Sequence, residues 1–216
     1  MARTRRADYL KSNRARAVPL ADPVPAAESA GRLLGARDAE GRRRLGSELL
    51  AILSKQTGIA APELVVPDDH QPHRRAGGRI VYSLQGEYRR RAPSADDPRV
   101  ARGGRPLGRI RVPNRTPARG DLVRASAFLN TLLHEFCHHH DAEALGLLRS
   151  FHTAGFYARL RHLRDQIEAA TLGIEDARAG EHDPRSAPRE APRGAADPRR
   201  SASSILSRMW SIIRDL

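Results

Sequence analysis

The chain contains very little cysteine and few aromatic residues. Among its 216 residues there is one cysteine, Cys137, and aromatic residues make up 4%. A single cysteine excludes an intramolecular disulfide and any cysteine-rich zinc finger. No apolar run approaches the roughly 20 residues that a membrane-spanning helix needs, and no uninterrupted apolar segment follows the basic N-terminus. These absences favour a cytoplasmic protein.

Apolar residues are also too few for the whole chain to pack into one globule. They make up 39%, and the mean hydropathy is −0.58, so part of the chain is expected to be unstructured. Residues 1–37 are charged and rich in Ala and Pro, which predicts a basic disordered arm. Residues 173–204 have the composition of a disordered linker. Residues 205–216 return to an apolar stripe, which predicts an amphipathic terminal helix that docks on the core or on a partner.

Positive charge dominates the sequence, with a formal net charge of +13. Residues 87–119 hold ten arginines against three acids. Such a stretch could bind the phosphates of a nucleic acid. The alternative explanation is a coding bias toward arginine, because lysine occurs only at positions 11 and 55.

The pattern of apolar residues predicts an α+β domain over residues 38–172. Three short apolar runs predict a three-stranded sheet: 64–66, 80–84 and 107–112. Three segments with a 3.6-residue period predict helices: 38–57, 121–144 and 153–171. Gly58 follows the first helix as a C-cap, and Asp121 is expected to be the N-cap of the second. Residues 85–106 have no period and are predicted to form an extended basic loop.

The second of these helices carries an H-E-x-x-H motif that begins at His134. Residues four apart share a helix face, so His134 and His138 can reach one metal ion. Zinc lowers the pKa of a bound water toward about 7, and Glu135 can take the proton of that water as it attacks a carbonyl. The alternative is a surface helix that happens to carry two histidines. Leu133 and Phe136 argue against it, because these apolar neighbours indicate that the helix is buried. Burial without a metal would leave the two histidines and the glutamate unpaired, which is costly.

A tetrahedral catalytic site needs a third protein ligand and an open position. Asp141 lies about 10 Å along the axis from the first motif histidine, so it is better placed to orient a ligand imidazole from behind. His139 and His140 point away from the ligand face, and Glu168 is expected to be solvated. His152 remains, because it follows a turn and precedes the next helix.

The motif, a gap of thirteen residues and the sequence H-T-A-G-F-Y from His152 together resemble the SprT-like and WLM-like minimal zincins. These are small metallopeptidase domains with two helices behind a short sheet. The resemblance covers residues 107–171, and it implies three zinc ligands and a catalytic base: His134, His138, His152 and Glu135. It also implies that the strand at 107–112 is the edge along which an extended peptide lies.

The chain departs from this family in two respects. It has no cysteine-rich zinc ribbon after the protease core, and Thr153 stands where a glycine usually follows the third ligand. A role in DNA repair is therefore not carried over from the resemblance, whereas the zincin core is.

The leading hypothesis is a zinc metallopeptidase that hydrolyses peptide bonds. Tyr157 either donates to the developing oxyanion or packs beside Phe156, and Cys137 is expected to pack rather than react. One alternative is a nucleic-acid-associated binding protein with a structural or vestigial zinc site, and another is a zinc amidohydrolase acting on a non-peptide substrate. Glu135 argues against a vestigial site, since a closed structural site has no use for a base.

Overall fold

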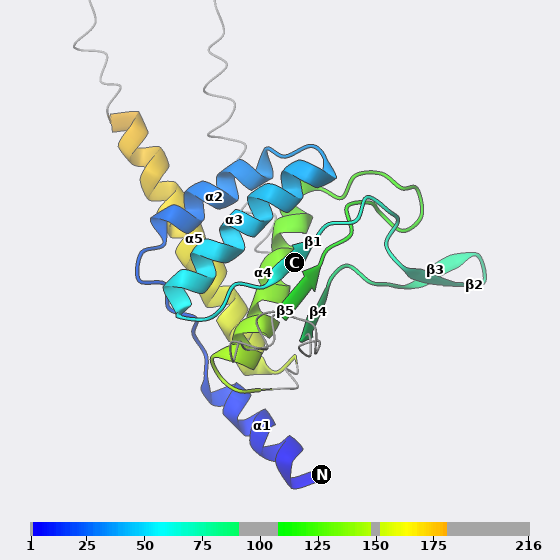
Figure 1. Cartoon of the computed structure of the whole chain (residues 1–216), viewed down its shortest axis with the longest axis horizontal. Helices are drawn as coiled ribbons and strands as arrows, with labels where there is room; N and C mark the ends of the chain where they lie inside the picture. Colours follow the sequence, from blue (N-terminus) through cyan, green and yellow to red (C-terminus); the bar gives the residue numbers. More distant parts are fainter. Residues whose placement is uncertain (1, 91–107, 148–151, 181–216) are drawn as a thin grey trace, which may run out of the picture.

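The computed structural model describes residues 2–90, 108–147 and 152–180, and it has the predicted mixed α+β composition (Figure 1). The helices are α1 (Ala2–Arg14), α2 (Val24–Leu34), α3 (Ala39–Thr57), α4 (Ala125–Glu143) and α5 (Ala154–Gly180). The strands are β1 (Glu63–Val65), β2 (His73–Ala76), β3 (Arg79–Ser83), β4 (Glu87–Arg90) and β5 (Gly108–Arg111). None of the described helices is long and apolar enough to cross a membrane.

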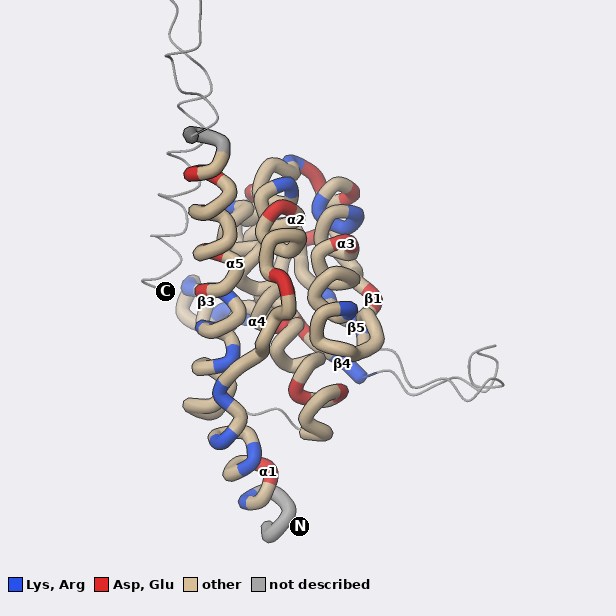
Figure 2. Tube along the Cα trace, turned by 90° about the vertical axis from the view of Figure 1, so that its left-hand side faces the viewer, with Lys and Arg blue, Asp and Glu red and all other residues tan. Residues whose placement is uncertain are grey.

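Helix α4 lies at the centre of the fold. Its apolar face, which includes Phe128, Leu132 and Phe136, is fully buried. Helices α2, α3 and α5 pack on it, and the main sheet covers another side (Figure 1). Charged residues stand on the outer turns of the helices, among them Lys11 and Arg14 at the end of α1 (Figure 2). The histidine motif is therefore carried by a helix that is packed on several sides.

Helix α3 begins and ends as predicted. The side chain of Asp38 accepts a hydrogen bond of 2.7 Å from the backbone N–H of Gly41, which is an N-cap. Gly58 ends the helix in the left-handed region, with φ of 69°. Leu49 and Leu53 on the inner face are fully buried.

The main sheet has the strand order β1-β5-β4, with β1 parallel and β4 antiparallel to β5. Two predictions about this sheet are wrong. First, the third strand of the sheet is β4, which comes from the stretch predicted to be a loop. Second, the strand predicted at 107–112 is β5, and it lies in the middle of the sheet rather than at an edge. Tyr88 is the only large apolar residue of β4, and its arginine neighbours Arg89 and Arg90 are exposed, so the strand shows no apolar run.

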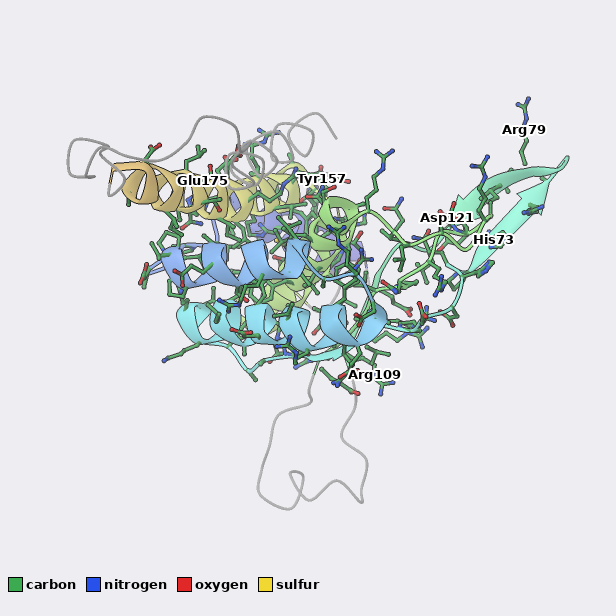
Figure 3. The ribbon with its side chains drawn as sticks, turned by 90° about the horizontal axis from the view of Figure 1, so that it is seen from above. His73, Arg79, Arg109, Asp121, Tyr157 and Glu175 are labelled. Carbon is green, nitrogen blue, oxygen red and sulfur yellow. The ribbon has the colours of Figure 1, made fainter. Side chains whose placement is uncertain are left out.

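The strand predicted at 80–84 forms, but outside the main sheet. It is β3, which pairs with β2 in a hairpin that projects from the body (Figures 1 and 3). Gly77 and Gly78 form the turn with φ of 55° and 76°, the positive values that two-residue hairpin turns require. Val81 and Tyr82 remain 63% and 47% exposed. Their β propensity forms the strand, but no layer covers it.

Residues 1–37 do not form the predicted disordered arm. In the part of this segment that the structure describes, α1 and α2 are formed, and α2 packs on α3 and α5. Small side chains allow this close packing: Ala26, Ala27 and Ala30 are buried. Between the two helices, Val18 and Leu20 are also part of the core. The alanine content that suggested disorder instead permits close contact.

The boundaries of the last two helices also differ from the prediction. Helix α4 begins at Ala125 without a side-chain cap, and the carbonyl of Asp121 instead accepts a hydrogen bond from the Thr116 N–H in the preceding loop. Helix α5 continues into the predicted linker as far as Gly180, because Ile174 extends its apolar stripe onto the core. The rest of the linker and the predicted terminal helix at 205–216 lie outside the described residues.

Candidate metal centre

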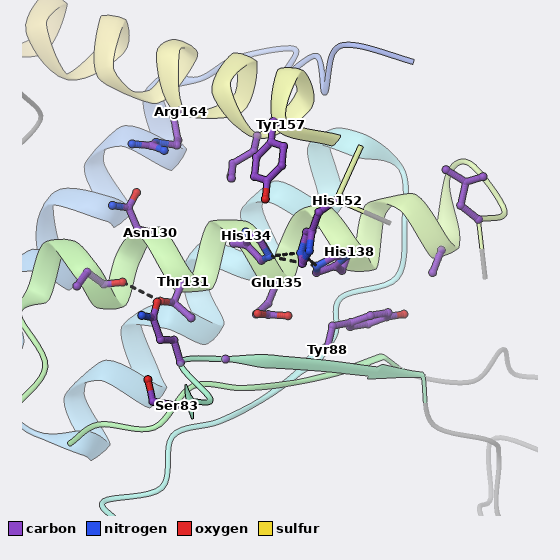
Figure 4. Close-up of a pocket in the computed structure, with 16 residues that line it drawn as sticks. Ser83, Tyr88, Asn130, Thr131, His134, Glu135, His138, His152, Tyr157 and Arg164 are labelled. Carbon is purple, nitrogen blue, oxygen red and sulfur yellow. Dashed lines mark hydrogen bonds between the residues drawn. The ribbon is translucent and has the colours of Figure 1, made fainter. Parts of the chain in front are cut away.

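Three histidine rings converge between α4 and the start of α5 (Figure 4). The Nε2 atom of His134 lies 2.9 Å from that of His152, and the Nε2 atom of His138 lies 3.2 Å and 3.0 Å from these two atoms. A tetrahedral ion with Zn–N bonds of about 2.0–2.1 Å would separate its nitrogens by about 3.3 Å. The triangle of nitrogens therefore has nearly the size that one zinc ion requires.

One aromatic side chain supports all three rings. The ring of Phe156, which is fully buried, has its centroid 5.0 Å from that of His134, 4.5 Å from that of His138 and 5.1 Å from that of His152. It occupies the space behind the rings and leaves their Nε2 atoms directed at one another. All three rings thus pack against one buried side chain.

The start of α5 is held in place by the N-terminal segment. The hydroxyl groups of Ser12 and Thr153 lie 2.8 Å apart, and the amide oxygen of Asn13 accepts a 3.0 Å hydrogen bond from the Gly155 N–H. A Cβ atom at Gly155 would lie 2.0 Å from the Ser12 carbonyl oxygen, so only glycine fits here. Because His152 directly precedes Thr153, these contacts also fix the third ring.

Burial keeps the two histidines of α4 in the neutral form. Burial, together with a smaller effect of the neighbouring imidazoles, lowers the pKa of His134 to about 4 and the pKa of His138 to about 3. A neutral imidazole is the form that binds a metal ion. Among the described residues, the group that could hold an ion consists of these two and His152. Three imidazole donors suit zinc.

Glu135 lies on the side of α4 that faces β4 (Figure 4). Its side chain is buried, and burial, with a smaller effect from Glu87, raises its pKa to about 7, while the backbone N–H of Tyr88 donates to it and opposes that rise. A Cβ atom at Gly86 would lie 2.8 Å from its Oε1 atom, so the strand approaches the carboxylate closely. A carboxylate with this pKa can both take up and release a proton near neutral pH.

Asp141, predicted to orient a ligand imidazole, is fully buried and its Oδ2 atom accepts a 2.7 Å hydrogen bond from Arg159. Arg159, also fully buried, donates in addition to the carbonyl oxygens of Ser12 and Ala15. The role that the structure shows for Asp141 is therefore to tie α4 to α5 and to the N-terminal segment.

Tyr157 is half exposed, and its ring packs edge-on against that of Phe156 with centroids 5.6 Å apart, as one of the two predictions for it stated. Its ring stacks on that of His152 with centroids 5.9 Å apart, and its hydroxyl end points toward the histidines (Figure 4). The side chain thus lines the same cavity as the three histidines.

The remaining candidates lie away from the cluster. His139 is buried and its Nε2 atom lies 2.7 Å from the carbonyl oxygen of Ala60, and His140 is buried too. Cys137 is fully buried, which raises the pKa of its thiol, as expected of a packing cysteine. Glu168, on α5, is not part of the metal-binding group found among the described residues.

A cavity of about 910 Å³ opens in front of the cluster. The three histidines and Glu135 line it from one side, the segment from Ser83 to Tyr88 lines it from a second, and Tyr157 lines it from α5. It is large enough for several residues of an extended peptide.

Comparisons of this chain with models of protein families, with curated proteins and with solved structures find no match.

Sequence reasoning did not single out Phe156 and Arg159 as parts of the site. A signal for Arg159 does exist: it stands beside Leu160 in the apolar stripe of α5, where a charged side chain must be paired if it is buried. Gly86 gives no such signal, because its closeness to Glu135 depends on the path of β4.

Proposed function

We propose that this protein is a zinc-dependent peptidase with a zincin-like core, in which His134, His138 and His152 bind the metal. The observation that carries the proposal is the convergence of three imidazole nitrogens beside a buried carboxylate in one open cavity. The structural alternative, a surface helix with two unrelated histidines, does not explain why a third ring, from the segment that leads into α5, lies beside the other two.

Zinc at this position would lower the pKa of a water molecule and polarise a substrate carbonyl. Glu135 would accept a proton from the attacking water and pass it to the leaving amine, and its pKa of about 7 suits both roles. The hydroxyl of Tyr157 donates to the carbonyl oxygen as negative charge develops there.

The edge strand for an extended peptide is β4 rather than the predicted 107–112. Among the described strands, β4 is the outer strand beside α4, and an outer strand offers backbone groups to a further chain. The segment that leads into it, from Ser83 to Gly86, lines the cavity. This supports a peptide over a small non-peptide amide, which would not use a strand edge.

The test is a digest of a peptide library by zinc-loaded protein and by its Glu135→Gln variant. The variant keeps all three ligands but has no base, so zinc content should be unchanged and hydrolysis should fall by about 10²–10⁴-fold. Glu28→Gln, an exposed position on α2, is the matched control and should keep activity. Near wild-type cleavage by zinc-loaded Glu135→Gln protein would exclude the mechanism.

Nucleic-acid binding is the second candidate function. The arginines best placed for it are those of the β2–β3 hairpin rather than those of residues 87–119. In the described part of 87–119, five arginines form ion pairs with acids: Arg89, Arg90, Arg109, Arg111 and Arg115. The β2–β3 hairpin instead carries Arg74, Arg75 and Arg79 with no acid between residues 70 and 86 (Figure 3). Binding through it should weaken steeply with salt, and no binding to DNA or RNA at low salt would remove this candidate.

A further inference from the structure

The cavity in front of the histidines has two chemically different ends. At one end, one turn before His134, α4 presents Asn130, and α5 presents Arg164 toward the same space (Figure 4). At the other end the lining residues are Ala142 and Leu147, which are apolar. A substrate that spans the cavity therefore meets a cationic, hydrogen-bonding end and an apolar end.

The direction of β4 relates these ends to the direction of a bound peptide. A Cβ atom at Gly86 would lie 2.5 Å from the side chain of Thr131, and Arg90 at the other end of the strand lies 3.5 Å from Glu143. Strand β4 therefore runs in the same direction as α4. Its beginning lies at the Asn130 end of the cavity.

A peptide that adds to β4 in the antiparallel sense runs the opposite way. Antiparallel pairing is the more stable arrangement of two strands, and strand addition is a common mode of peptide recognition. The residues that follow the scissile bond then extend from the histidines toward Asn130. They meet Arg164 within the first few positions.

The guanidinium of Arg164 suits a carboxylate at this place. The side chain is half buried: burial lowers its pKa, and the nearby carboxylates of Asp165 and Glu168 act in the opposite direction. An arginine stays charged at neutral pH and has five N–H donors. It can keep a contact with an acid of its own helix and still donate to a second carboxylate. Partial removal from water strengthens that attraction.

We propose that Asn130 and Arg164 form a subsite for a carboxylate on the C-terminal side of the scissile bond. The preferred substrates are then peptides with an acidic side chain, or a free C-terminal carboxylate, just after the cleaved bond. This inference rests on the proposed peptidase function and adds the substrate class.

The experiment uses the zinc-loaded full chain and three fluorogenic peptides that differ only on the C-terminal side of the cleaved bond. The first has Glu just after the cleaved bond and an amidated C-terminus. The second has Gln at that position and an amidated C-terminus, and the third has Gln there and a free C-terminal carboxylate. At least one carboxylate peptide should have a kcat/KM about tenfold or more above that of the Gln amide, since charge-assisted hydrogen bonds contribute about 1.5–3 kcal/mol. Which of the two is preferred identifies the source of the carboxylate.

Arg164→Gln should bring this ratio close to one. Arg161→Gln, an exposed arginine of the same helix outside the cavity lining, should keep it. Thermal unfolding of both variants checks that the fold is intact, and the wild-type ratio needs no variant at all. Equal kcat/KM values for all three peptides, or a higher value for the Gln amide, would overturn the subsite.

The subsite and the proposed function can fail separately. Cleavage of the Gln amide peptide reports the function, and the ratio between peptides reports the subsite. If no peptide is cleaved, the function fails, and the subsite is judged by fluorescence anisotropy with zinc-loaded Glu135→Gln protein. In that assay the Arg164→Gln change should weaken binding of a carboxylate peptide about tenfold, and an unchanged affinity would reject the subsite.

Discussion

The segment 12–20 and the β2–β3 hairpin lie on opposite sides of the candidate site and differ in how the fold uses them. The first has no regular structure after α1 ends at Arg14, yet Val18 and Leu20 are buried. The second is regular and contains Val81 and Tyr82, yet both are largely exposed. Regular secondary structure and burial of side chains are therefore independent in these two segments. Burial depends on whether another element packs against the segment.

The partner of the segment 12–20 is α5, whose polar side chains bind its backbone. The side-chain amide of Gln166 donates to the Val18 carbonyl over 2.8 Å and accepts from the Leu20 N–H over 2.9 Å. Arg159 binds the Ser12 carbonyl over 2.7 Å. These bonds satisfy backbone groups that would otherwise be costly to bury. The hairpin has only its own second strand, so it gains no such burial.

This difference assigns different tasks to the two sides of the cavity. The side built on segment 12–20 positions His152 and must not move. The side that continues from the hairpin into Gly86 and β4 faces the substrate, where adaptability is useful. Each prediction below tests one part of this contrast.

The largest effect should come from His152, the ligand held by the buried side. His152→Ala removes one of three donors, and zinc affinity should fall by more than about 100-fold, because loss of outer partners alone costs 10–100-fold. Competition with a chromophoric chelator measures it. His70→Ala, an exposed histidine next to the hairpin, should leave the affinity unchanged. Wild-type affinity in His152→Ala protein would mean that the third ligand is another group.

The next effect concerns the buried ion pair that joins α4 to α5. Asp141→Ala leaves the guanidinium of Arg159 buried without its carboxylate, which should lower the free energy of unfolding by about 3–5 kcal/mol. Urea unfolding measures it. The control is Asp69→Ala, which breaks an exposed pair with Arg111 and should cost far less. Equal losses would show that the pair at Asp141 is not desolvated.

The sequence predicted the parts of this site that depend on local spacing. The interval between His134 and His138 fixes a shared helix face, and the apolar period that starts near Asp38 and the C-cap at Gly58 fix the bounds of α3. The burial of segment 12–20 could not be predicted in this way, because Val18 and Gln166 are 148 residues apart in sequence. The order of the main sheet was missed for a related reason, since β4 owes its place to contacts of Gly86 and Tyr88 with α4.

The stability of the metal-free protein should depend on pH. Unfolded histidines have a pKa near 6.5, whereas burial lowers those of His134 and His138 to about 4 and about 3 in the folded protein. Between pH 6.5 and about 4 the unfolded chain therefore binds protons that the folded protein does not, so stability is full above pH 6.5 and decreases as the pH falls. Urea unfolding of chelator-treated protein at several pH values measures this. A His134→Gln variant should show a shallower decrease, and an identical slope would mean that its ring is solvated.

The smallest effect is expected in the hairpin, and it is the sharpest test of the contrast. Val81 and Ile110 are both β-strand residues, one 63% exposed in β3 and the other fully buried in β5. Val81→Thr should change the free energy of unfolding by no more than about 0.5 kcal/mol, whereas Ile110→Val should cost about 0.5–1.5 kcal/mol. Both are measured by urea unfolding at one pH. If Val81→Thr costs as much as Ile110→Val, the hairpin docks on the body in solution. The apolar pattern at 80–84 would then mark a core strand after all, and the adaptable side of the cavity would begin at β4 instead of at the hairpin.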